Sequence, residues 1–87
     1  MSLILDSRLA GGGHLGFHAL LDGEPAIVEL DSGAIFKLAK RATHDELDRI
    51  LEEKRQKICD AAIRLAREGF LTRGEKGVEI LVTALDL

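Results

Sequence analysis

The chain has 87 residues, of which 46% are hydrophobic and 31% are charged, and this balance excludes an intrinsically disordered protein. The length allows one small domain, residues 1–87, and the 3% aromatic content, all phenylalanine, predicts a core of aliphatic side chains. The formal net charge of −3 excludes a uniformly basic protein that steers polyanions to its surface.

The N-terminal segment contains a short apolar run followed by three glycines. The run Leu3-Ile4-Leu5 is consistent with an additional edge strand over residues 2–6. The run Gly11-Gly12-Gly13 lacks the Gly-Lys-Ser/Thr sequence of a phosphate-binding loop. We interpret it as a flexible lead into the next element.

A β-hairpin is the strongest local feature of the sequence. Residues 14–21 and 25–31 are joined by Asp22-Gly23, the dipeptide preferred in a two-residue type I′ turn. Such a turn fixes the register, and one face then carries the pairs Leu21–Glu24, Ala19–Ala26, Phe17–Val28 and Leu15–Leu30. The other face carries the pairs His18–Ile27, Gly16–Glu29 and His14–Asp31. The match between turn chemistry and apolar pairing therefore predicts both the hairpin and its register.

A short helix is predicted directly after the hairpin. Ser32 is the expected N-cap of a helix over residues 33–41, since serine side chains accept hydrogen bonds from the first free amides of a helix. Lys40 and Arg41 would suit its C-terminal end through the helix dipole.

A second, longer helix follows. Thr43 and Glu46 have the spacing of a capping box, and Gly69 is placed to end the helix in a left-handed conformation. Apolar residues between these limits recur at spacings of three and four, which is typical of one buried stripe. Lys54 interrupts the stripe and is expected to extend its ammonium group to solvent.

The last part of the chain completes the predicted fold. Residues 71–77 contain two glycines and are expected to form a polar turn, and residues 78–85 alternate as a final strand. The element order is β-β-α-α-β, with the N-terminal run as an optional extra strand. We predict an α+β fold in two layers, in which a mainly antiparallel sheet of three to four strands is covered on one face by two helices.

Several of these patterns together resemble a known family. They are the segment Phe17 to Gly23, the residues Ile58 and Ala61-Ala62 in the charged helix, and the closing stretch Gly77 to Leu87. In this combination the chain resembles the small bacterial proteins catalogued as domain of unknown function 1488, over nearly its whole length. The resemblance implies a compact α+β fold in a bacterial cytoplasm, and it brings no catalytic residues.

The cellular compartment is predicted from absent signals. The first six residues lack the basic and apolar regions of a signal peptide, and no apolar run approaches the roughly 20 residues of a membrane span. A single cysteine, Cys59, excludes an intramolecular disulfide and a cysteine-based zinc cluster. Because Cys59 falls in the middle of a helix, we interpret it as a packing residue rather than a reactive thiol. We expect a cytoplasmic protein that makes no membrane contact and binds no cofactor.

Candidate chemical sites are sparse. His14 and His18 would be about 13 Å apart on a strand, so a metal site with His44 and Asp31 would need an unforeseen tertiary convergence. His14 opposite Asp31 has the composition of a general-base dyad, but a cross-strand charge pair is the simpler interpretation. We therefore predict neither a metal site nor a catalytic site.

A weak basic patch is the candidate for nucleic-acid contact. Its residues, around the end of the second helix and the following turn, are Arg64, Arg67, Arg73 and Lys76. Glu68 and Glu75 dilute its charge, and there is no aromatic platform for stacking bases. We expect nucleic-acid binding to be the less favoured of two interaction modes.

The face of the sheet that two helices cannot cover is the favoured functional surface. It is expected to carry Leu20, Ile27, Leu81 and Leu85, a contiguous apolar group of the kind found at partner surfaces. We predict a non-enzymatic interaction or accessory module that forms a homodimer through this face and has room for another protein partner. The alternatives are a nucleic-acid-associated regulator and an enzyme built around the histidines and Asp31.

Overall fold

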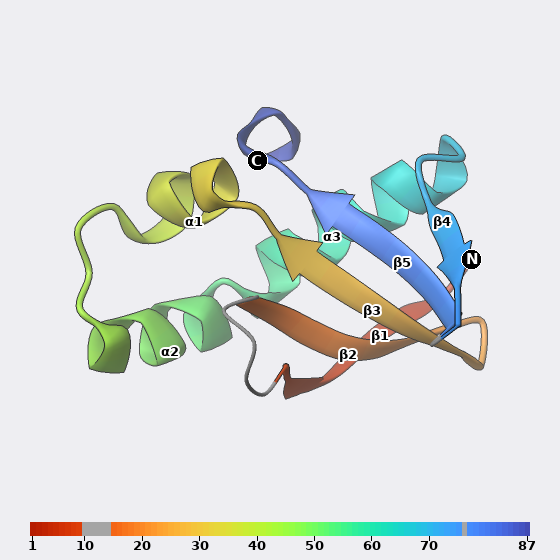
Figure 1. Ribbon diagram of the computed structural model, residues 1–87, viewed down its shortest axis with the longest axis horizontal. Coiled ribbons are helices and arrows are strands. Elements are labelled where there is room, and N and C mark those ends of the chain that lie inside the picture. Colours follow the sequence, from red (N-terminus) through yellow and green to blue (C-terminus); the bar gives the residue numbers. More distant parts are fainter. Residues whose placement is uncertain (10–14, 76) are drawn as a thin grey trace.

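The computed structural model describes residues 1–9, 15–75 and 77–87, and it describes the backbone alone at His44. In chain order the elements are β1 (Leu3–Arg8), β2 (Leu15–Leu21), β3 (Glu24–Leu30), α1 (Ser32–Ala39), α2 (His44–Glu53), α3 (Arg55–Arg67), β4 (Thr72–Gly74), β5 (Gly77–Val82) and the 3-10 helix η1 (Ala84–Asp86). Figure 1 shows α3 running behind the sheet while α1 and α2 extend beyond one end of it. The triple glycine Gly11 to Gly13 lies outside the described residues.

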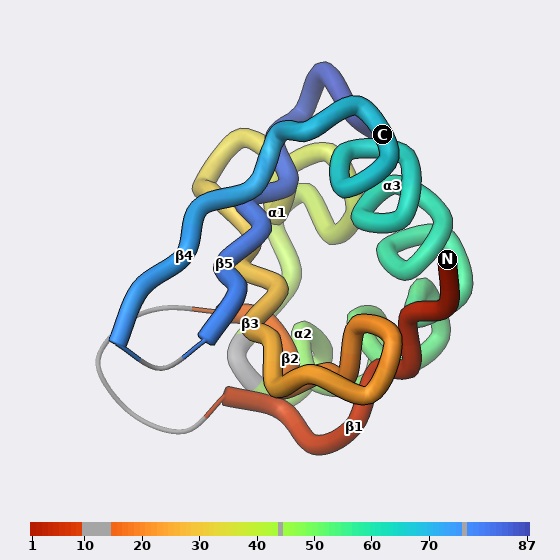
Figure 2. Tube along the Cα trace, turned by 90° about the vertical axis from the view of Figure 1, so that its right-hand side faces the viewer, coloured from red at the N-terminus to blue at the C-terminus, as the bar shows by residue number. Residues whose placement is uncertain are grey.

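The strands form one mixed sheet, so the predicted α+β class is confirmed. Their order is β1-β2-β3-β5-β4, and the pairing is antiparallel except between β3 and β5. The helices lie on one side of this sheet (Figure 2). The sheet has five strands rather than three or four, because the N-terminal run does form β1 and because β4 was not foreseen. β4 has three residues, all exposed, so it carries no apolar alternation that sequence reasoning could detect.

The β2–β3 hairpin has the predicted register. Phe17 pairs with Val28 and Ala19 with Ala26, and all four side chains are buried beneath the helices. Asp22 and Gly23 both have positive φ, 52° and 82°, as a type I′ turn requires. The turn also receives the N-terminus, because the Ser2 amide donates to Oδ1 of Asp22 at 2.7 Å.

Helix α1 begins one residue earlier than expected. Its N-cap is Asp31, whose Oδ1 accepts from the Ala34 amide at 2.7 Å, so the prediction of Ser32 as the cap was wrong. The amide of Asp31 donates to the Val82 carbonyl at 3.1 Å and keeps this residue extended at the end of β3. Asp31 therefore links the end of β3 to the start of α1, and the helix begins at Ser32.

The second predicted helix is two helices, α2 and α3, separated at Lys54. The N-cap prediction was right, since Oγ1 of Thr43 accepts from the Glu46 amide at 3.4 Å. The predicted continuity was wrong, because Lys54 leaves helical geometry with φ −95° and ψ 9°. Directly after the break, Nη1 of Arg55 donates to the carbonyl oxygens of Leu5 and Asp6 at 2.9 and 3.0 Å. These bonds hold the start of α3 against β1 and turn the helix across the sheet.

Two guanidinium groups lie over the ring of Phe17, the largest fully buried side chain among the described residues. Arg55 lies 4.9 Å and Arg8 5.7 Å from the ring centroid, a separation at which cations attract the face of an aromatic ring. Asp48 accepts from Arg8 at 2.9 Å, and Glu52 accepts from Arg55 at the same distance. The ion pairs hold both guanidinium groups in place at the border of the core.

The last strand is shorter than predicted. β5 ends at Val82, and Thr83 then caps η1: the Thr83 amide donates to Oδ2 of Asp86 at 2.8 Å and Oγ1 of Thr83 accepts from Leu85. The prediction of a strand over residues 78–85 was therefore wrong at its C-terminal end. Alternating apolar residues continue through Leu85, but this local capping box ends the strand.

Candidate functional site

The face of the sheet turned away from the helices is called here the outer face. Because side chains alternate along each strand, the observed register assigns it three cross-strand rows. The rows are Ile4–Leu20–Pro25, His18–Ile27–Glu79–Thr72 and Gly16–Glu29–Leu81. No described helix crosses these rows (Figure 2). The outer face is therefore open over the described part of the chain.

Apolar side chains lie at both ends of the outer face. Ile4 is 61% exposed and neighbours Leu20, which is 44% exposed, and Leu81 is 53% exposed at the other end. Ile27 is half-buried between them. Three of the four residues expected on this surface thus share it. Leu85 does not, because it belongs to η1, where it is 95% exposed.

One edge of the sheet is stepped. β4 pairs with β5 at Gly77, Val78 and Glu79, and beyond Glu79 no described strand lies beside β5 on that side. Residues 80–82 still pair with β3 on the other side. This step, the edge of β5 over residues 80–82, is called here the notch.

The backbone of Leu81 faces the notch. Along a strand, consecutive residues direct their amide and carbonyl groups to opposite sides. The Val82 carbonyl accepts from Asp31 on the β3 side, so the carbonyl and amide of Leu81 are directed to the opposite side. In the antiparallel register of β4, the residue that would meet them is Phe70.

Phe70 cannot extend β4 because it ends helix α3. Its amide donates to the Leu65 carbonyl at 2.8 Å, and the Gly69 amide donates to Ala66 at 3.1 Å. Gly69 has φ +83°, so these bonds form a Schellman motif, and the predicted left-handed end of this helix is confirmed. Because the Phe70 amide is bound in this cap, it cannot pair with Leu81, and β4 therefore stops short of Leu81 and leaves the notch.

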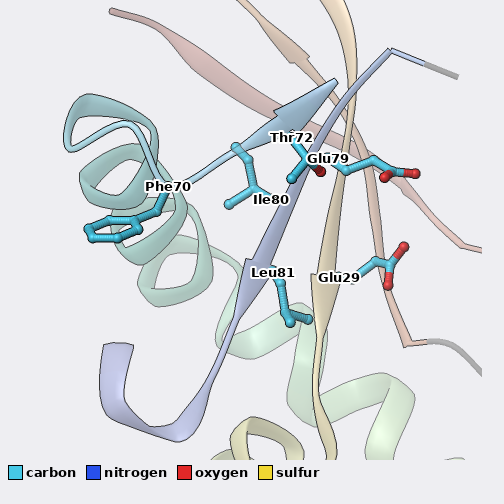
Figure 3. Close-up of a pocket in the computed structure, with 6 residues that line it drawn as sticks. All are labelled: Glu29, Phe70, Thr72, Glu79, Ile80 and Leu81. Carbon is cyan, nitrogen blue, oxygen red and sulfur yellow. The ribbon is translucent and has the colours of Figure 1, made fainter. Parts of the chain in front are cut away.

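A groove of about 290 Å³ lies around the notch, lined by Glu29, Phe70, Thr72, Glu79, Ile80 and Leu81. Figure 3 shows the Phe70 ring on one side of β5 and the carboxylates of Glu29 and Glu79 on the other. Phe70 is 62% exposed, although it is a large aromatic side chain. The groove thus combines an apolar wall, a carboxylate wall and an open strand edge.

The histidines do not form a site among the described residues. His18 is exposed on β2, whereas His14 lies outside the described residues and the side chain of His44 is not described. Asp31, the proposed partner of His14, is engaged as the N-cap of α1. In the described ranges no three residues of the metal-ligating types come together.

The predicted basic patch is divided between separate ion pairs. Arg64 donates to the Asp86 carbonyl at 2.7 Å. Arg73 binds the carboxylate of Glu24 at the β2–β3 turn at 2.8 Å. Arg67 is exposed at the end of α3, and Lys76 lies outside the described residues. Over the described positions, the charges are therefore directed to different contacts rather than to one phosphate site.

Cys59 is half-buried beneath β1. Its thiol donates to the Leu3 carbonyl at 3.3 Å. Burial, with a contribution from neighbouring Asp60, raises the pKa of the Cys59 thiol above its ordinary value. A thiol with a raised pKa is a weak nucleophile at neutral pH.

Sequence reasoning missed two contributors to this surface. Ile4 was assigned to an optional strand, and the pairing of that strand with β2 places it beside Leu20. Phe70 was not considered, although the sequence Glu68-Gly69-Phe70 is the pattern of a helix end with an apolar residue after the glycine. That signal was available and would have placed an aromatic residue at the end of α3.

Comparison with protein-family models, curated proteins and solved structures gave no match for this chain. The resemblance to domain of unknown function 1488 therefore stays a prediction. Among the described residues, no helix is both long enough and apolar enough to cross a membrane.

Proposed function

We propose that this protein is a non-enzymatic interaction module of the bacterial cytoplasm, that it acts through its outer sheet face, and that it forms a homodimer there. The observation that carries the proposal is the exposure of Ile4, Leu20 and Leu81 on one sheet face that no described element covers. Apolar side chains gathered on one face, rather than scattered singly, are typical of a contact surface. A second copy is the favoured occupant because two-fold self-association is the commonest oligomer of soluble proteins.

The size of the face sets the expected strength of the dimer. Strands of this length spaced at sheet distance span roughly 20 by 20 Å, about 400 Å² of sheet plane. A stable interface buries about 800 Å² on each partner. We therefore expect a weak, reversible dimer with a dissociation constant in the micromolar range or above.

Sedimentation equilibrium from micromolar to millimolar protein tests the dimer. Leu20→Glu places a charge beside Ile4 within the proposed interface and should make the protein monomeric throughout this range. Phe36→Glu is the matched control, since Phe36 is 62% exposed on α1 and lies off the outer face. A wild-type protein that stays monomeric, or a dimer that Leu20→Glu leaves intact, would contradict the proposal.

Nucleic-acid regulation and enzymatic activity remain the weaker alternatives. Arg64 and Arg73 already bind acceptors of this chain, and no described cluster assembles catalytic groups. A gel shift at low salt that depends on Arg67 and disappears at higher salt would favour the nucleic-acid alternative over the proposal.

A further inference from the structure

We propose that the notch binds an extended segment of another protein as an added strand, and that the segment places an arginine or lysine opposite Leu81. The inference rests on the proposed function for its premise that the outer face binds protein. It names a second contact on that face and the chemistry of its partner.

The backbone at the notch can pair with an added strand. The amide and carbonyl of Leu81 are directed into the notch, and the amide of Phe70 is committed to the Leu65 carbonyl. In an antiparallel pair, one residue placed opposite Leu81 satisfies both groups at once. Peptides that add to a sheet in this way gain affinity from main-chain hydrogen bonds and selectivity from alternate side chains.

The groove beside the notch has room for one side chain of the added strand. A volume of about 290 Å³ lies at the lower limit of small-molecule sites, which span about 300 to 1,000 Å³. It is large enough for one long side chain of a docked strand. The side chain of a residue opposite Leu81 would point to the outer face, as Leu81 does, and lie beside the groove.

The negative charge of Glu79 indicates which side chain the bound segment carries opposite Leu81. Glu79 lies diagonally across from that position, a separation that long side chains reach. No ion pair engages Glu79 among the described residues. The exposed side chain of Leu81 offers apolar contact to an aliphatic stem on this face, and the Glu79 carboxylate accepts a cationic end. Arginine and lysine have this construction.

The segment comes from a different protein rather than from a second copy. Arg73 is the basic residue on the neighbouring edge strand β4, and it is already bound by Glu24 at 2.8 and 3.1 Å. The chain as a whole carries a net charge of −3. A basic segment therefore complements the notch better than the same edge of a second copy does.

The length of the segment is also limited. Thr72 of β4 already occupies the position opposite Glu79. A bound strand that runs in the direction of β4 must therefore leave the sheet shortly after the residue opposite Leu81.

Titration of the isotope-labelled full chain with a short peptide, followed by amide chemical shifts, tests the proposal. The probe is acetyl-Thr-Val-Arg-Val-Gly-amide, and the largest shifts are expected at residues 79–82. Replacing its arginine by glutamine should weaken binding roughly fivefold, because a charge-assisted hydrogen bond is lost. Methylation of the arginine amide nitrogen should abolish binding, because the bond to the Leu81 carbonyl cannot form.

Protein variants separate this site from the dimer interface. Glu79→Gln should weaken binding of the arginine peptide about as much as the glutamine peptide does, whereas Glu75→Gln, in the turn outside the groove, should leave binding unchanged. Leu20→Glu should remove dimerisation and retain peptide binding, so failure of one proposal is distinguishable from failure of the other.

Three results would overturn the inference. One is equal affinity for the arginine and glutamine peptides, and another is equal affinity for the methylated peptide. The third is a shift of the Leu81 amide that follows the concentration of the Leu20→Glu variant alone, since a second copy would then fill the notch without the dimer interface.

Discussion

The two faces of the sheet are built from the same strands and differ in nearly every physical respect. On the inner face, Phe17, Val28 and Val82 have no exposed surface. On the outer face, Leu20 and Leu81 are about half exposed, and they alternate in sequence with those buried residues. Apolar composition alone therefore does not distinguish core from surface in this chain.

The difference between the faces arises from where the helices lie. α3 crosses the inner face, and its residues Ile58 and Ala62 are fully buried there. Thirteen residues in α3 cannot also reach the other side. A chain of this length covers one face of a five-stranded sheet and leaves the other for a partner or for solvent.

Replacement of Phe17 by alanine should give the largest change in the free energy of unfolding. It is the most direct test of the difference between the two faces. Phe17→Ala should lower the free energy of unfolding by about 3–5 kcal/mol, because it removes a fully buried ring and both cation–π contacts. Leu20→Ala, on the outer face of the same strand, should change it by about 0.5 kcal/mol or less. Urea denaturation followed by circular dichroism measures both.

A milder variant keeps this test informative if Phe17→Ala does not fold. Phe17→Leu should cost about 1–2 kcal/mol. Similar costs for the substitutions at positions 17 and 20 would mean that the two faces do not differ as the structure shows.

Substitution of Gly77 should cost more stability than substitution of Leu20 on the outer face. Its φ is +107°, and a Cβ there would lie 2.4 Å from the Pro25 carbonyl oxygen. Gly77→Ala should therefore cost about 2–4 kcal/mol, from backbone strain together with the clash. Gly74→Ala is the matched control, since its Cβ would meet the flexible side chain of Glu79 at 3.3 Å.

Thermal unfolding compares the two glycine variants. The control should cost less than about 1 kcal/mol. Equal losses in both variants would show that close packing at the β4–β5 turn, rather than the geometry of Gly77, limits substitution.

The sequence predicted the inner face far better than the outer one. The Asp22-Gly23 turn has one preferred geometry, and once it is placed every pair from Leu21–Glu24 to Leu15–Leu30 follows. The helix end at Gly69 was equally readable, because a left-handed residue there is favoured by glycine. Both features are determined by residues close together in the sequence, so they could be predicted from the local sequence.

The remaining features depended on contacts between distant segments. The break at Lys54 is accompanied by hydrogen bonds from Arg55 to carbonyls 49 and 50 residues away, and spacing along the helix cannot indicate them. The notch requires both the cap at Phe70 and the parallel pairing of β5 with β3. Its candidate residues could therefore be assembled only from the three-dimensional structure.

The junction between sheet and helices offers a smaller test. Asp31→Ala should lower the free energy of unfolding by about 1 kcal/mol, because the Ala34 amide at the start of α1 loses its acceptor. Ser32→Ala should change it by a few tenths of a kcal/mol at most, since Ser32 is exposed within the first turn. Chemical denaturation of both variants decides which residue is the cap, and a larger loss at Ser32 would contradict the assignment.

The smallest expected effect is the pH response of Cys59, at the border between β1 and α3. Burial raises the pKa of its thiol in the folded protein, so the folded state binds the proton more tightly than the unfolded state does. Stability from this residue is fully present below the ordinary thiol pKa of 9.0 and is lost as the pH rises through the higher folded value. The unfolding free energy of the wild type should therefore fall relative to Cys59→Ala above about pH 9.

Iodoacetamide should likewise alkylate the folded protein more slowly than the denatured chain at the same pH, because less thiolate is present. Equal rates, together with parallel pH profiles, would show that the contact with the Leu3 carbonyl does not shield the thiol, and would place Cys59 with the open surface rather than with the core.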